Sequence, residues 1–182
     1  MPRIASVTAA TLAALALNGC ATLNVSSHVE RSSNFTQFHT YDWGPADALP
    51  TGDPRLDTNP FFHDYFQGAV DKELAGKGFE QSQSGTPDLL IHYHANVTRR
   101  FAVAGVNNEY GPCTTENCQP RLNEYEAGTL VLDVVDTRTN KVIWRGWAQQ
   151  RVDRLLADQE SMREHVTESV VRMMSRFPRS QR

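Results

Sequence analysis

The stretch GTLVLDVVDTRTNKVIWRGWAQQRV, residues 128–152, decides the fold. Two runs of alternating apolar and polar residues flank DTRTNK, residues 136–141, whose composition is typical of a turn. The pattern predicts an antiparallel β-hairpin. Side chains at every second position of a strand share a face, so one set is expected to be buried. That set is Leu130, Leu132, Val134, Val142, Trp144 and Ala148.

A second alternating run, PDLLIHYHANVTRRF at residues 87–101, predicts another strand with one buried and one solvated face, as in an antiparallel sheet. The expected buried face contains Leu89, Ile91, Tyr93, Ala95 and Val97. The expected solvated face contains His92, His94, Asn96, Thr98 and Arg100. Shorter strands are predicted around Val25 to Val29 and around Tyr41 to Trp43.

Two segments have helical spacing instead. The first follows Asn59, a suitable N-cap, and Pro60, which suits a first helical turn. Its apolar stripe is Phe62, Tyr65, Phe66, Ala69, Val70 and Leu74. The stripe of the second is Met162, Val166, Ser169, Val170, Met173 and Phe177, before Pro178. The chain is therefore predicted to be α+β: a two-layer sandwich of a mainly antiparallel sheet with two amphipathic helices packed on one face.

The N-terminal residues have a different character. Arg3 precedes an apolar run from Ile4 to Leu17 that is too short to span a bilayer comfortably, and small residues follow it. This pattern predicts a signal peptide over residues 1–19. Leu17-Asn18-Gly19-Cys20 resembles the lipobox of bacterial lipoproteins, which implies lipidation of Cys20 with acyl chains such as palmitate. A core helix with an incidental cysteine is the alternative.

The lipobox resemblance divides the chain. Residues 20–35 are expected to form the lipidated N-terminus, a tether and a first edge strand, residues 36–178 a single α+β domain, and residues 179–182 a basic tail. In this lipoprotein class an Asp after the cysteine commonly causes retention in the inner membrane, whereas this chain has Ala21. The implied location is the bacterial cell envelope, on the outer membrane and facing the periplasm.

Export changes the interpretation of Cys113 and Cys118. They lie in NNEYGPCTTENCQPRLNEY, residues 107–125, which is predicted to be a loop. In an oxidising periplasm a structural disulfide is expected. A zinc half-site and a redox dithiol are the alternatives, but no second cysteine pair or nearby His is present.

Charge argues against nucleic acid as a partner. Without residues 1–19 the chain has seventeen basic and twenty-one acidic side chains, because Arg3 is the only charged residue removed. Nucleic-acid binding requires a basic surface instead.

Four blocks of the sequence resemble the bacterial lipoproteins of the domain of unknown function 4136 family. They are DPRLDTNPFFHDYFQGAVDKELAGKGFEQ, PDLLIHYH, GTLVLDVVDTRTNKVIWRGWAQQRVD and VVRMMSRFP. The resemblance covers about Val25 to Pro178 and implies an envelope lipoprotein with an α+β domain. It implies no catalytic residues, ligand or cofactor.

The polar face of the sheet is the candidate site. His92 and His94 project to the same side of a strand and could ligate zinc or copper if a third ligand converged. Neighbouring Arg100, Asp133 and Arg145 could complete a binding face, with Asp133 and Arg145 expected to form a cross-strand ion pair. Nucleophile elbows, zinc-protease motifs and phosphate loops are absent from the sequence.

Three functional hypotheses follow. The first is a non-enzymatic envelope lipoprotein that binds a partner protein or cell-wall polymer, and the second is a metal-binding protein or metal-dependent enzyme using His92 and His94. The third is a carrier of a small ligand bound against the aromatic side chains of the first helix, Phe62, Tyr65 and Phe66.

Overall fold

The computed structural model describes residues 23–44, 53–104, 121–153, 156 and 158–180. A 3-10 turn at Phe35–Gln37 lies between the first two strands. In chain order the other elements are β1 (Asn24–Val29), β2 (Thr40–Trp43), α1 (Pro54–Asp57), α2 (Pro60–Gly76), β3 (Glu80–Gln81), β4 (Leu89–Ala104), β5 (Arg121–Asp136), β6 (Lys141–Arg151) and α3 (Gln159–Met174).

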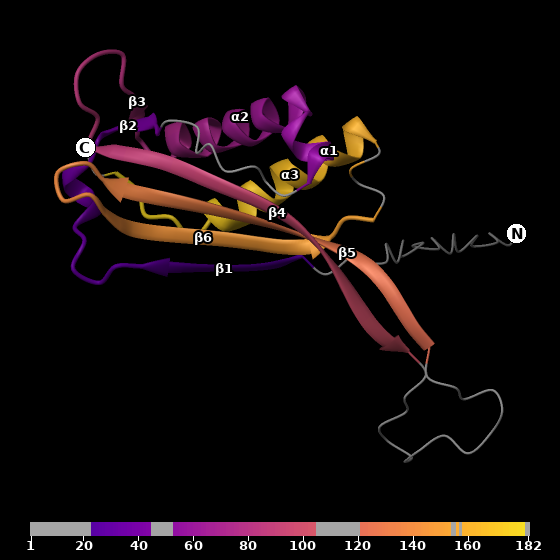
Figure 1. The fold of residues 1–182 in the computed structure, drawn as a ribbon. Coiled ribbons are helices and arrows are strands. Elements are labelled where there is room, and N and C mark those ends of the chain that lie inside the picture. The colour runs from indigo at the N-terminus through magenta and orange to yellow at the C-terminus, as the bar shows by residue number, and fades with distance from the viewer. Residues whose placement is uncertain (1–22, 45–52, 105–120, 154–155, 157, 181–182) are drawn as a thin grey trace, which may run out of the picture.

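The six strands form one sheet in the order β1-β6-β5-β4-β2-β3 (Figure 1). Strands β1, β6, β5 and β4 pair antiparallel with their neighbours. Strand β2 pairs parallel with both β4 and β3. The predicted α+β class with a mainly antiparallel sheet is confirmed.

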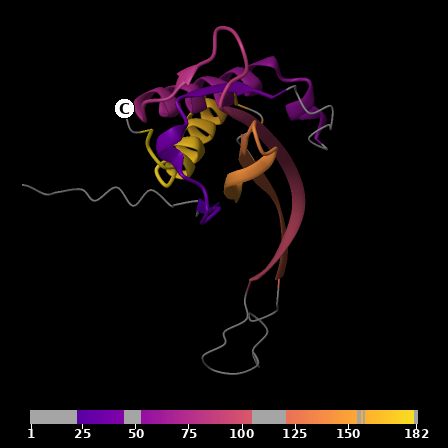
Figure 2. The same ribbon diagram turned by 90° about the vertical axis from the view of Figure 1, so that its left-hand side faces the viewer.

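Helices α2 and α3 pack together against one face of the sheet, as predicted (Figure 2). We call the face that they cover the inner face and the opposite one the outer face. Among the described residues, no helix has both the length and the apolar character needed to cross a membrane.

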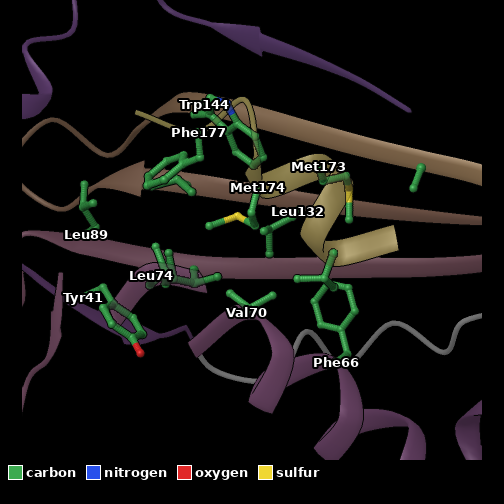
Figure 3. Packing of buried hydrophobic residues seen from close by; sticks show 14 of the residues in the cluster. Tyr41, Phe66, Val70, Leu74, Leu89, Leu132, Trp144, Met173, Met174 and Phe177 are labelled. Atoms are coloured by element: carbon green, nitrogen blue, oxygen red, sulfur yellow. The ribbon is translucent and has the colours of Figure 1, made fainter. Parts of the chain in front are cut away.

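The core lies between the helices and the inner face (Figure 3). Phe66, Val70 and Leu74 of α2 are fully buried against the sheet. The Trp144 indole is equally buried, and its ring centroid lies 5.1 Å from that of Phe177. The apolar stripes of the sequence are therefore mainly core.

The predicted start of the first helix is confirmed. The side chain of Asn59 accepts hydrogen bonds from the backbone nitrogens of Phe61, at 3.0 Å, and Phe62, at 3.3 Å. These bonds satisfy amides that have no partner within the helix.

The hairpin differs from the prediction at one position. Val142 is 44% exposed rather than buried, and Ile143 is buried instead. Val134 pairs with Trp144 and Val135 pairs with Val142, so Ile143 is an extra residue in β6. Such a β-bulge changes the alternation of faces locally, which a strict two-residue period does not anticipate.

The long β4–β5 pair extends beyond the rest of the sheet. The pairing of β6 with β5 ends at Arg151 with Ala127. Beyond it, among the described residues, six pairs join β4 to β5 alone; they run from Arg99–Glu126 to Ala104–Arg121. We call these six pairs the arm; it projects from the domain in Figure 1. The sequence prediction was wrong for residues 121–125, which belong to β5 and not to a loop.

The base of the arm is tied to the helical layer. Arg55 of α1 contacts Asp53 at 2.5 Å and Glu126 of β5 at 2.8 Å. The hydrogen bond with Arg55 lowers the pKa of the Asp53 carboxyl. The backbone amide of Glu126 also donates a hydrogen bond to Asp153 Oδ1, at 2.7 Å. We call the set Asp53, Arg55, Glu126 and Asp153 the arm clamp.

Replacement of Gly146 by Ala is predicted to destabilise the domain. A Cβ at this position would overlap ring atoms of Trp144, which is fully buried in the core. Overpacking of a filled core costs about 1–3 kcal/mol, and we expect a loss of that size in urea unfolding of G146A.

The matched control is Gly68→Ala in α2, where an added Cβ meets nothing within 4 Å. Alanine in an exposed helix interior should raise stability by about 0.5–1 kcal/mol relative to glycine. Equal effects of the two substitutions would contradict the proposed role of Gly146.

Candidate functional site

Four polar side chains form a row across the outer face. Arg145 of β6 pairs with His28 of β1 on one side and with Asp133 of β5 on the other, and Asp133 in turn pairs with His92 of β4. Neighbouring strands lie about 4.8 Å apart, so adjacent members of the row are within contact range. We call these four residues the outer-face row.

The centre of the row is an ion pair. Arg145 Nε lies 2.6 Å from Asp133 Oδ1, and Arg145 Nη2 lies 2.6 Å from Oδ2, so both carboxylate oxygens accept a hydrogen bond. Asp133 is only 4% exposed, whereas about half of the Arg145 side chain is open to solvent. Hydrogen bonding to Asp133 raises the pKa of the Arg145 guanidinium. The carboxylate is therefore held by its neighbour and is not presented as a free acid or base.

His92 occupies a close-fitting position at one end of the row. A Cβ at Gly44 would overlap its imidazole ring, so only glycine leaves room for His92 there. His94 lies on the same face two residues along the strand, beside Val131, and is exposed. Among the described residues, no group of three or more His, Cys, Asp or Glu side chains is placed to hold a metal ion.

Arg100 does not join this row. It lies on the outer face, but eight residues beyond His92, a separation of about 27 Å along the strand. Its partner on β5 is Tyr125, and the guanidinium of Arg151 lies over the Tyr125 ring at 4.4 Å. The structure thus brings together Asp133, Arg145 and His92 and places Arg100 on the arm.

A second polar cluster was missed in the sequence. Asp71 Oδ1 of α2 accepts hydrogen bonds from the Tyr41 hydroxyl at 2.9 Å and from Trp43 Nε1 at 3.0 Å. Nearby, His63 Nδ1 hydrogen-bonds the Tyr93 hydroxyl. His63 and Asp71 are eight residues apart on α2, and this spacing was the one sign in the sequence that both could face the sheet.

The tyrosines of this cluster have a structural role. Burial, followed by the Asp71 hydrogen bond and charge, raises the pKa of Tyr41, and burial raises the pKa of Tyr93 to about 12. The Tyr41 hydroxyl donates to Asp71, and the Tyr93 hydroxyl shares a hydrogen bond with His63, so the two phenols join α2 to β2 and β4.

One cavity lies where the inner face meets the first turns of α3. Its volume is about 40 Å³, and Phe62, Met162, His165 and Ser169 are among its lining residues. The buried His165 Nδ1 has no hydrogen-bond partner within the described part of the chain. This volume holds a few water molecules rather than a typical small-molecule ligand. Of the aromatic side chains proposed to bind a ligand, only Phe62 lines it.

Three predicted sites lie outside the described residues. They are the lipidation site Cys20 and the two cysteines of the expected disulfide, Cys113 and Cys118.

The fold and the outer-face row define a two-layer α+β domain whose sheet is covered by helices on one face only. The chain belongs to the family described as domain of unknown function DUF4136, whose model matches residues 25–179. No curated protein matches the chain.

Solved structures add a likeness in fold. A PDZ-domain protein from Parabacteroides distasonis is 17% identical, with a TM-score of 0.57 over 88% of this chain; the match covers 37% of that protein, so this chain spans little more than a third of its length. The PelC dodecamer from Paraburkholderia phytofirmans is 10% identical, with a TM-score of 0.46 over 88% of this chain and 100% of that one.

Loss of Arg145 should leave a buried carboxylate without its partner. We expect Arg145→Ala to lower the free energy of unfolding by about 1–3 kcal/mol. The double variant with Asp133→Ala should lose less than the sum of the two single variants, because the pair is coupled. Urea unfolding of all four proteins at neutral pH measures the coupling, and strictly additive losses would show that the contact contributes nothing.

Proposed function

We propose that this chain is a lipid-anchored protein of the bacterial cell envelope, held on the outer membrane through Cys20 and facing the periplasm. The observation that carries the proposal is ALALNGC, residues 14–20, directly ahead of a family domain that begins at residue 25. Two or three acyl chains on a cysteine anchor a protein stably without a spanning helix. Ala21 supports the outer membrane, because Asp is common at this position in retained lipoproteins.

The domain itself acts as a non-enzymatic binding module for another envelope protein. Three features of the outer face support this role. Helices leave the face uncovered, Trp147 is 38% exposed on it, and about half of the neighbouring Arg145 side chain is open to solvent. Tryptophan and arginine are the residue types most enriched at the energetic centres of protein interfaces.

Catalysis and metal chemistry have less support on the same face. The Asp133 carboxylate is bonded at both oxygens by Arg145. A metal at His92 and His94 would need a third protein ligand, and Asp133 could supply one only by giving up this pair.

Lipidation is testable on the mature protein. When the full chain is expressed in a bacterium with two membranes, we expect mass spectrometry to show a species that starts at Cys20 and has diacylglycerol and acyl mass, located in the outer-membrane fraction. Cys20→Ala should abolish the modification and release the protein from membranes. The matched control is Cys113→Ala, which should leave anchoring unchanged. A mature species that retains residues 1–19 would contradict the proposal.

Binding through the outer face is testable by photo-crosslinking in intact cells. A benzophenone amino acid at position 147 should form an adduct with one specific envelope protein. The yield should fall severalfold when exposed His28, in the same row, is changed to Glu, because a carboxylate beside Arg145 would compete with the partner for its guanidinium. The same photo-reactive residue at Glu168, exposed on α3, is the control and should give no adduct. Adducts only with peptidoglycan would replace the protein partner with a cell-wall polymer.

A further inference from the structure

The arm exposes apolar side chains to an unusual degree. Leu122 is 67% exposed and Phe101 is 60% exposed, the highest values among the large apolar side chains of the described residues. Phe101 pairs with Glu124, and Leu122 lies two residues from Glu124 on β5, so both belong to the same face of the arm. A two-stranded ribbon is marginally stable in water by itself, and this one has no helix over its apolar residues in the described structure.

Cationic and aromatic groups surround these two side chains. Arg99 and Arg100 directly precede Phe101, and Tyr125 lies opposite Arg100. The nearby acids are already paired: Glu124 lies 3.6 Å from Arg99, and Glu126 is held by Arg55. Arginine with Tyr and exposed apolar side chains is a composition typical of the boundary between lipid headgroups and acyl chains.

The first strand begins at the same end of the sheet as the arm. Asn24 pairs with Gln149 of β6, Gln149 pairs with Thr129 of β5, and Thr129 pairs with Asn96 of β4. The arm begins three residues further along β4, at Arg99. Strand β1 then runs away from the arm for six residues, or about 20 Å.

A lipid on Cys20 would therefore restrict the orientation of the domain. Asn24 is four residues after Cys20 in the sequence, and a fully extended chain of this length reaches about 14 Å. If the arm pointed away from the membrane, the length of β1 would separate Asn24 from the lipid surface by more than this reach. The arm must instead point toward the membrane or lie along it, with Phe101 about 17 Å beyond the level of Asn24.

We propose that the arm is a second, non-covalent membrane contact, in which Phe101 and Leu122 enter the lipid interface while Arg99 and Arg100 face the headgroups. This inference rests on the proposed lipidation of Cys20. Lipid is favoured over a second copy of the chain because the short tether brings the arm to the membrane in every protomer, with no partner required.

The test uses the full lipidated chain in vesicles of phosphatidylcholine and phosphatidylglycerol, with Phe101→Trp as the probe. The emission added by this tryptophan, relative to the unsubstituted protein, should shift to shorter wavelength. It should also be quenched about twofold when the phosphatidylcholine has brominated acyl chains, as expected for a side chain buried at the boundary of headgroups and acyl chains. The matched control is Val142→Trp, an exposed position at the other end of the sheet, which should be neither shifted nor quenched.

The outcomes separate the two proposals. Protein that floats with the vesicles and shows unquenched Phe101→Trp emission overturns the arm proposal and leaves lipid anchoring intact. A shifted but unquenched emission together with crosslinked dimers assigns the arm to a second copy and also overturns it. Protein that has no acyl mass and does not float overturns the proposed function, and the arm proposal with it.

Discussion

The rest of the structure depends on the unbroken pairing of β4 with β5. Each strand has sixteen residues and spans about 53 Å, whereas the seventeen residues of α2 span only about 26 Å, because a helix rises less than half as far per residue. Helices of this length cannot cover such a ladder. The ladder consequently has a packed part, with a core under α2 and α3, and an uncovered part of six pairs, which is the arm.

Much of the packed half could be predicted from local pattern. Alternation in residues 128–152 indicated the hairpin, and Asn59 before a 3.6-residue apolar period indicated α2. The bulge at Ile143 could not be predicted, because an extra residue in one strand interrupts the two-residue period on which the prediction rests. The start of β5 could not be predicted either, since residues 121–125, three of which are Arg, Asn and Glu, form a strand through pairing with β4 and not through their own propensity.

The candidate site divides along similar lines. The shared face of His92, Asp133 and Arg145 could be predicted from the two-residue period of the strands. That period does not give the distance between residues along a strand. Arg100 was therefore grouped with the other three, although it belongs to the arm. The Asp71 cluster joins residues from α2 and β2 that are about thirty positions apart in sequence, and only the packing of the two elements brings them together.

The arm clamp also sets a boundary in local stability. Glu126 is held by Arg55 from α1 and its amide by Asp153, and Arg151 lies over the Tyr125 ring. The pairs from Phe101 outward have only the arm itself as a partner among the described residues. Opening of the outer pairs therefore disturbs no core residue and needs less free energy than global unfolding. Opening that passes Glu126 must also break the contacts of Glu126 with Arg55 and Asp153. The domain thus behaves as two cooperative units on one ladder, and its outer unit can open and reclose while the core stays folded.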